Sequence, residues 1–158
     1  MNGITDINDL INITSSFEIQ EISLIAPTTE SQLEIWLSCA MGGIEANRSY
    51  NQFTSALLTG PFNKEAMLRA LQDLVNMHQS FRMSFSDNGK NIIVHKEVIL
   101  DVDYRDLSSQ TTDQQQQFIK NHSKQNILIS FDLLKAPLFK ASLFKLSENE
   151  HYLTMNNI

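Results

Sequence analysis

The residue types that most often catalyse reactions or hold metals are few in this chain and far apart. Its four histidines are His78, His95, His122 and His151, and no two of them have the spacing of paired metal ligands. The sequence therefore predicts no metal site. Cys39 is the only cysteine, and a cysteine paired with a histidine can act as a nucleophile. Its place on or beside the apolar side of a predicted helix favours a buried structural thiol instead.

The acidic residues give no clearer sign of catalysis. Asp101, Asp103 and Asp106 lie close together, and on a strand Asp101 and Asp103 would share one face. That arrangement is more typical of a solvated face than of a pair of catalytic carboxylates. Glycine-rich phosphate-binding motifs, such as G-x-G-x-x-G, are absent from the sequence. The residues alone thus predict no catalytic residue and no self-sufficient active site.

Charge and hydropathy limit the partners and the compartment. The formal net charge is -6, and the 12 Lys and Arg residues form no cluster, which argues against nucleic acid and anionic membrane surfaces as partners. No apolar run approaches the length of a membrane span. The N-terminal stretch "MNGITDINDLINI" is acidic and lacks the pattern of a signal peptide. One cysteine cannot form an internal disulfide, so we expect a cytoplasmic protein.

Three helices and several strands would have to position any site. Apolar residues at spacings of three and four predict helices over 28–41, 64–78 and 111–125. Thr28 or Thr29 would cap the first and Asn63 the second, and Gly42-Gly43 would end the first. The glutamine run in the third helix is interpreted as a solvated face.

The remaining segments have the pattern of strands. In the predicted hairpin 81–95, Phe81, Met83 and Phe85 would face one side and Arg82, Ser84 and Ser86 the other, with a tight turn at Asn88-Gly89. Further strands are predicted within residues 21–27, 50–60, 98–108, 137–146 and 151–158. The expected fold class is α/β (an α+β sandwich), with a mixed β-sheet flanked by helices.

Two segments carry a family resemblance. "PTTESQLEIWLS" resembles P-L-S-x-A-Q-x-R-L-W, the opening signature of nonribosomal peptide synthetase condensation domains, with Glu34 where the family often has arginine and Ser31 where it has alanine. "MHQSFRMSF" resembles the second signature, R-H-E-x-L-R-T-x-F, with Met77 in place of the leading arginine and Phe81 in place of leucine. The matching residues that define this structural signature are Gln32, Trp36, His78, Arg82 and Phe85, together with Pro27 and Ile35.

The resemblance covers residues 22–158 and implies one lobe of a chloramphenicol-acetyltransferase-like fold, the N-terminal lobe of a condensation domain. In that family the next residues would be the catalytic H-H-x-x-x-D-G, whose second histidine assists attack of an amine on a thioester. Arg82 would pair with the aspartate of that motif. Gln32 and Trp36 would either pack in the core or line the substrate tunnel.

The resemblance also implies partners. Substrates would arrive on the phosphopantetheine arms of carrier proteins, with no cofactor bound directly by this chain, and a C-terminal lobe would complete the tunnel. Residues 1–21, with a short apolar stripe, would form a leader or linker, or a segment that docks an upstream synthase.

Two hypotheses for function follow. The first is part of an amide-forming acyltransferase that is inactive by itself; the alternative is a non-catalytic docking module for a carrier protein or an upstream synthase. We also expect self-association, either through a face that a second lobe would cover or, if it lies at a sheet edge, through the final strand.

Overall fold

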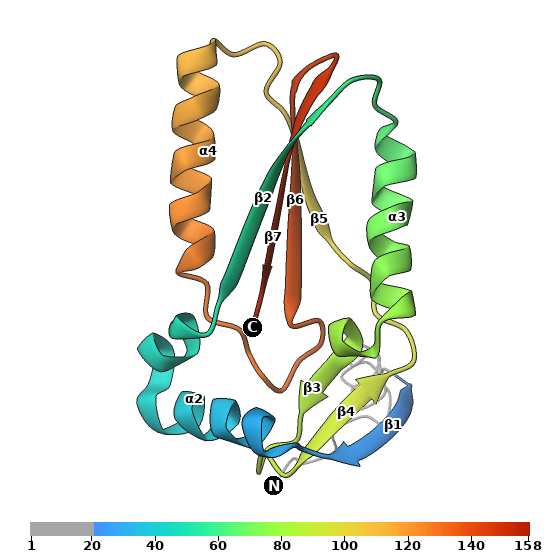
Figure 1. The fold of residues 1–158 in the computed structure, drawn as a ribbon, viewed down its shortest axis with the longest axis vertical. Coiled ribbons are helices and arrows are strands. Elements are labelled where there is room, and N and C mark those ends of the chain that lie inside the picture. The colour runs from blue at the N-terminus through green and yellow to red at the C-terminus, as the bar shows by residue number, and fades with distance from the viewer. Residues whose placement is uncertain (1–20) are drawn as a thin grey trace, which may run out of the picture.

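The computed structural model describes residues 21–158, whose strands form two sheets (Figure 1). The larger sheet has four strands in the order β2-β7-β6-β5, and the smaller has three in the order β1-β4-β3. The helices are α2 (Glu30–Ser49), α3 (Lys64–Met77) and α4 (Thr112–Ile127). The mixed α/β class is as predicted, whereas the division of the strands into two sheets was not predicted.

The larger sheet is mixed. Strand β7 (Glu150–Asn157) pairs antiparallel with β2 (Gln52–Thr59) on one side and with β6 (Phe139–Ser147) on the other. Strand β5 (Val102–Asp106) is parallel to β6, because α4 lies between them in the chain and supplies the long crossover that a parallel pair needs. The final strand is therefore an interior strand, and the suggestion that it could template pairing at a sheet edge is wrong.

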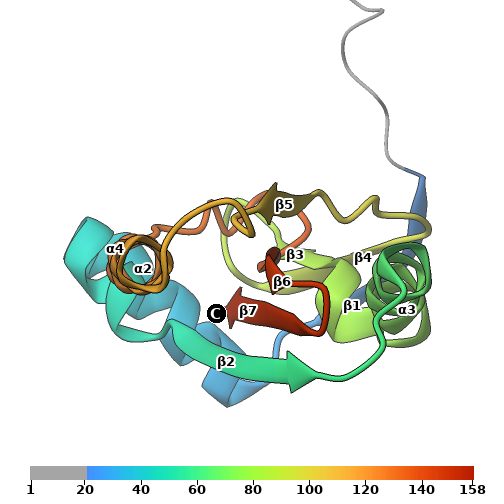
Figure 2. The ribbon, with the colours of Figure 1, turned by 90° about the horizontal axis from the view of Figure 1, so that it is seen from above.

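Helices α3 and α4 cover opposite faces of the larger sheet (Figures 1 and 2). Leu71 and Val75 of α3 pack on Phe139, Leu143 and their neighbours in the main hydrophobic core. Because side chains alternate along β6, Phe144 points to the other face. There it lies edge-on to Phe118 of α4, with ring centroids 5.1 Å apart.

The smaller sheet and α2 form the other end of the molecule (Figure 1). Strand β4 (Asn91–His95) lies between β1 (Ile22–Pro27) and β3 (Met83–Phe85), antiparallel to both. A second hydrophobic cluster fills the space between α2, β3 and the segment before β6, and its buried members are Cys39, Phe85, Phe131, Leu133 and Leu138.

The predicted end of α2 is wrong. Gly43 has φ 64° and ψ -147°, which bends the helix, but the chain resumes helical geometry and continues to Ser49. Asn47 fixes this second part, because its buried side chain receives a hydrogen bond from the Phe131 amide (2.8 Å) and donates one to the Phe131 carbonyl (2.9 Å). A long-range contact of this kind overrides the local glycine signal.

The predicted hairpin is also shorter than expected. Gln79–Arg82 forms a 3-10 turn, so Phe81 and Arg82 lie before β3 and not in a strand. The Ser86 amide donates to the Asn91 carbonyl (2.9 Å), which closes a loop of the intervening residues 87–90. Gly89 has φ 68°, whereas Asn88 does not have a positive φ, so the tight two-residue turn was wrong.

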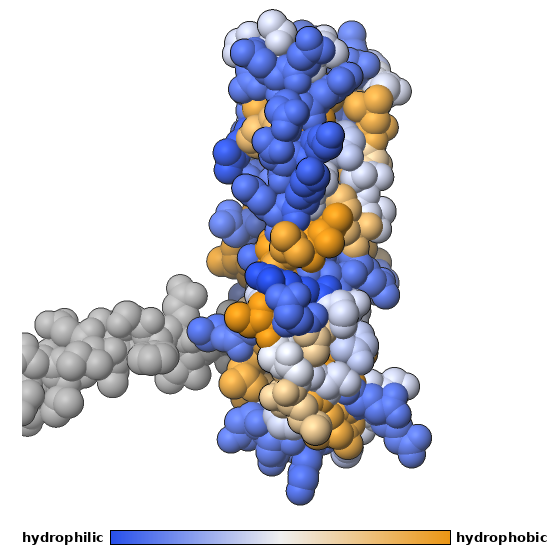
Figure 3. All heavy atoms as spheres, turned by 90° about the vertical axis from the view of Figure 1, so that its left-hand side faces the viewer, coloured by the Kyte–Doolittle hydropathy of each residue, from blue (hydrophilic) through white to orange (hydrophobic). Residues whose placement is uncertain are grey.

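The predicted caps are confirmed. Thr29 caps α2 in a reciprocal capping box with Gln32, and the Asn63 side chain accepts from the Ala66 amide. The outer surface of α4 is hydrophilic (Figure 3), in line with a solvated glutamine run. Gln115 is an exception, because its amide donates to the carbonyls of Leu107 and Leu146, each at 2.9 Å. No helix in residues 21–158 is long and apolar enough to cross a bilayer.

Candidate functional site

Three signature residues meet where α2 approaches the small sheet. Gln32 serves the helix cap, and its Oε1 accepts from the Thr29 amide at 2.9 Å. Trp36 packs on the second hydrophobic cluster, and its indole covers Gly89 in the hairpin loop. Phe85 is 4% exposed within that cluster, and its amide donates to the Leu133 carbonyl at 2.7 Å. These contacts hold α2, the hairpin and the segment before β6 together.

The other two signature residues lie at the end of α3. His78 is the C-terminal cap of the helix, and its amide donates to the Leu74 carbonyl at 3.2 Å. Its ring is exposed and meets Phe81 edge-on, with centroids 6.0 Å apart. Gln32, Trp36 and Phe85 thus lie together, whereas His78 and Arg82 belong to a separate junction between α3 and β4.

Arg82 makes a different set of contacts from the two that the sequence suggested for this chain, which were solvent and an acidic partner. Its Nε donates to the Val75 carbonyl (3.1 Å), and its Nη1 donates to the carbonyls of His95 (2.6 Å) and Lys96 (2.9 Å). No carboxylate within the described residues pairs with it. The guanidinium therefore joins the last turn of α3 to the end of β4 through carbonyl oxygens.

Cys39 is a buried thiol, as predicted. It is 9% exposed in the second hydrophobic cluster. Burial raises the pKa of its thiol, and a hydrogen bond with Asn47 opposes part of this shift. A thiol with a raised pKa is a poor nucleophile at neutral pH. The residue therefore contributes to packing and not to covalent catalysis.

A Ser-His pair was missed in the sequence. Ser84 Oγ lies 3.0 Å from His95 Nε2 on the neighbouring strand, and Ser84 is 1% exposed. The other ring nitrogen, His95 Nδ1, is buried without a hydrogen-bond partner in the described part of the chain, so no acid orients the ring. Burial lowers the pKa of His95. Cross-strand pairing of Ser84 with Ile93 was needed to find this contact, and the geometry is that of a structural polar pair.

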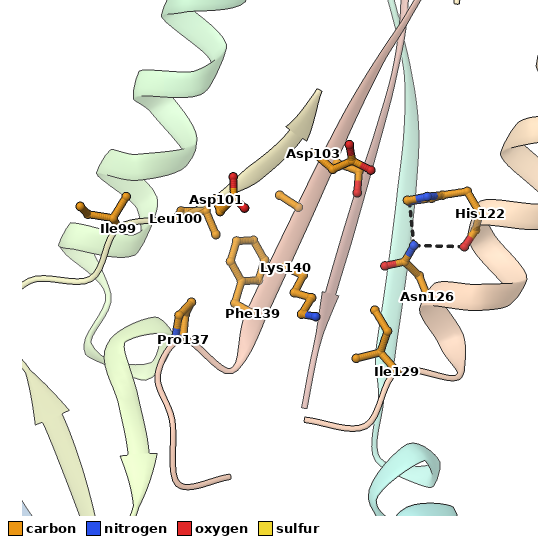
Figure 4. Close-up of a pocket in the computed structure, with 12 residues that line it drawn as sticks. Ile99, Leu100, Asp101, Asp103, His122, Asn126, Ile129, Pro137, Phe139 and Lys140 are labelled. Atoms are coloured by element: carbon orange, nitrogen blue, oxygen red, sulfur yellow. Dashed lines mark hydrogen bonds between the residues drawn. The ribbon is translucent and has the colours of Figure 1, made fainter. Parts of the chain in front are cut away.

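A polar groove opens on the face of the larger sheet beside α4 (Figure 4). We call it the α4 groove; its volume is about 410 Å³. Polar side chains from three elements and the segment before β5 converge on it, namely Asp101, Asp103, His122, Asn126, Lys140 and Ser142. The predicted solvated face that carries Asp101 and Asp103 is thus one wall of a hollow. The sequence did not indicate this, because α4 brings His122 and Asn126 from a distant part of the chain.

His122 is the titratable group of the α4 groove with the clearest shift. Burial lowers the pKa of His122, the charge of Asp103 opposes the shift, and Arg105 adds to it. The ring is therefore predominantly neutral at pH 7. Its Nε2 lies 2.7 Å from Asn126 Nδ2 and accepts a hydrogen bond from it, which places the ring proton on Nδ1. The groove can hold a polar group by hydrogen bonds, but it presents no activated nucleophile.

Metal binding has no structural support in the described residues. No group of three or more His, Cys, Asp or Glu side chains in residues 21–158 is arranged to hold a metal ion.

Comparison with known proteins defines the class. The sequence model of the Condensation domain family matches residues 24–157, and the chain belongs to this family. It is similar to tyrocidine synthase 3 of Brevibacillus parabrevis, at 36% identity over 68% of this chain and 2% of that protein. It is also similar to chondramide synthase cmdD of Chondromyces crocatus, at 27% identity over 83% of this chain and 3% of that protein.

The fold agrees with this class. The starter condensation domain of rhizomide synthetase RzmA superimposes with a TM-score of 0.73 at 18% identity, over 85% of this chain and 34% of that one. The chain thus has the fold of part of a condensation domain, the chloramphenicol-acetyltransferase-like fold that the sequence predicted. It spans about a third of this solved structure and a few per cent of the relatives.

Proposed function

We propose that residues 22–158 act as the N-terminal lobe of a condensation domain that joins carrier-bound acyl and aminoacyl groups. The observation that carries this proposal is the family match over residues 24–157. In the reaction, an acceptor amine attacks the carbonyl carbon of a donor thioester. A C–N bond forms, the C–S bond breaks, the thiol takes up a proton, and the amine loses one.

The described residues support the lobe and do not perform this chemistry. The amine must lose its proton, and a placed neutral imidazole can accept it. The sequence has no H-H-x-x-x-D-G motif to supply that imidazole. We therefore assign Gln32, Trp36, Phe85 and Arg82 to holding the elements of the lobe in place, on the contacts described above. The same contacts favour core packing over a tunnel-lining role for Gln32 and Trp36.

The substrates and partners follow from the proposed function. Donor and acceptor arrive on the phosphopantetheine arms of carrier proteins, and a second lobe completes the tunnel. Residues 1–21, of which only Glu21 is described, form a leader that docks an upstream synthase. Deleting residues 1–20 is then expected to abolish binding to that synthase without changing the circular dichroism of the lobe; unchanged affinity or a collapsed spectrum would contradict docking.

A graft tests the proposed function. Residues 24–157 replace the matching segment in a condensation domain of the tyrocidine synthase relative, and the graft is supplied with loaded carrier proteins. We expect amide product by mass spectrometry, and none from a control graft whose H-H-x-x-x-D-G histidines are replaced by alanine. A graft that keeps the native circular dichroism and binds carrier protein, but forms no product, would contradict the proposal.

The 158 residues supplied alone separate the two hypotheses. We expect no amide product above the uncatalysed background, because the sequence holds no catalytic histidine motif. Binding of a loaded carrier protein to these residues, measured by isothermal titration calorimetry, would favour the docking module if the graft is also inactive.

A further inference from the structure

The four edge strands of the two sheets are protected to different degrees. An open edge exposes unpaired N–H and C=O groups, and natural edges are commonly short, charged, bulged or interrupted by proline. Strand β3 has only 3 residues, and β1 has an irregular register between Ile22 and Leu24 and ends at Pro27. Strand β5 has 5 residues, of which Asp103, Arg105 and Asp106 are charged.

Strand β2 has none of these protections. Its 8 residues, QFTSALLT, include no charged residue and no proline, and its register with β7 is regular from Gln52 to Thr59. It forms the outer margin of the larger sheet, on the side opposite β5 (Figure 2). Within the described residues, β2 makes no backbone hydrogen bond outside its ladder with β7.

Side chains along β2 are also open to solvent. Thr54, Ser55, Ala56 and Leu57 are consecutive exposed residues, and Leu57 is 55% exposed. A regular, neutral and exposed edge can accept another strand without desolvating a charge.

We propose that two copies of the chain pair through β2 in antiparallel orientation, which joins their four-stranded sheets into one continuous sheet. A second copy is the occupant that fits, because the strand meets itself about a twofold axis normal to the sheet. Residues of the same face then lie opposite one another. No like charges meet along the strand, since Gln52–Thr59 is neutral.

The axis is centred near Ser55 and Ala56, in the middle of the strand. Ala56 pairs with Leu153 of β7 and is itself exposed, so a longer side chain at this position has room in the single chain. In the pair, the two copies of residue 56 lie next to each other. A charge introduced there therefore acts on the contact between copies and leaves the core of the lobe unchanged.

Charge substitutions test the pairing. Sedimentation velocity of the 158-residue chain from micromolar to millimolar concentration is expected to show a shift from 18.0 kDa towards twice that mass. Ala56→Lys and Ala56→Glu are each expected to weaken the dimer at least about tenfold, because like charges oppose one another across the axis. Ala70→Lys, at an exposed position of α3, is the matched control and is expected to dimerise normally.

Mixing the two charge variants gives the sharper result. Ala56→Lys and Ala56→Glu together are expected to restore a dimer that contains one copy of each. Hydrogen exchange of the unsubstituted chain is expected to show β2 amides whose protection rises with protein concentration. A chain that stays monomeric, a dimer that both variants leave unchanged, or β2 protection independent of concentration would overturn the proposal.

Discussion

Gly89 lies directly under the indole ring of Trp36. A Cβ on residue 89 would come within 2.2 Å of Trp36 Cδ2, closer than non-bonded carbons approach. The same loop is held by Thr28, whose Oγ1 donates to the Gly89 carbonyl at 3.0 Å. One glycine therefore closes the hairpin loop and sets the distance between that loop and α2.

Gly89→Ala is expected to destabilise the lobe by about 2–4 kcal/mol. Part of this loss comes from placing a side chain at φ 68°, and part from moving the Trp36 ring. Urea unfolding followed by far-UV circular dichroism measures the change. In a Trp36→Ala background the same substitution is expected to cost less, by at least about 1 kcal/mol, because the ring is gone. Equal losses in both backgrounds would show that the contact carries no energy.

Arg82→Met is expected to destabilise the lobe by about 2 kcal/mol, because the carbonyls of Val75, His95 and Lys96 lose a charged donor. Arg82→Lys is expected to recover only part of this, since one ammonium cannot reproduce the planar fork of donors. Arg69→Met, at an exposed position of α3, is the matched control and should stay within about 0.5 kcal/mol of the native chain. A loss no larger than that of the control would contradict a positioning role for Arg82.

Local patterns predicted the elements whose signals agree with their surroundings. The caps Thr29 and Asn63 and the amphipathic face of α3 needed only neighbouring residues. The kink at Gly43 was misread as an end, because Asn47 is fixed by Phe131, 84 positions away. Contacts between distant segments decided where the local signal was ambiguous.

The family signature was predictable, but its structural use was not. Arg82 matches the family motif, yet its carbonyl partners depend on the 3-10 turn that replaces the start of the predicted strand. The α4 groove could not be inferred, because it requires His122 and Asp103 to be brought together by the crossover between β5 and β6.

Stability is expected to fall as the pH is lowered from 7.5 to 5. Burial lowers the pKa values of His95, His122 and His151 below the usual 6.5, so the unfolded chain binds more protons than the folded chain in this range. The contribution is fully present above pH 6.5 and is lost as the pH falls towards the folded-state values. Each histidine adds at most about 1.4 kcal/mol per pH unit.

His151→Phe isolates one of these contributions. His151 is 4% exposed and stacks on Phe62 with ring centroids 3.8 Å apart, so a phenyl ring can take its place. Urea unfolding at several pH values is expected to show a shallower pH dependence for this variant. Asp106 does not confuse the result, because its pKa is lowered below 3.8, outside the range tested. An unchanged slope would mean that His151 does not titrate on unfolding.

Cys39 is expected to react with iodoacetamide only when the lobe opens. The thiol is 9% exposed and its pKa is raised by burial, so the folded state offers little accessible thiolate. Asn47→Ala removes the side chain that satisfies both the amide and the carbonyl of the buried Phe131. The expected loss of stability is about 3 kcal/mol.

That loss makes opening, and hence alkylation of Cys39, about a hundredfold faster. Asn76→Ala is the matched control, because Asn76 is exposed and its side chain accepts only from the Gln72 side chain, at 3.0 Å. The rate is read by mass spectrometry of the intact chain at fixed pH. Removing Asn47 also removes a hydrogen bond that lowers the Cys39 pKa, which by itself would slow the reaction in the folded state. A faster rate can therefore come only from opening, and an unchanged or slower rate would show that Asn47 does not hold the second part of α2 in place.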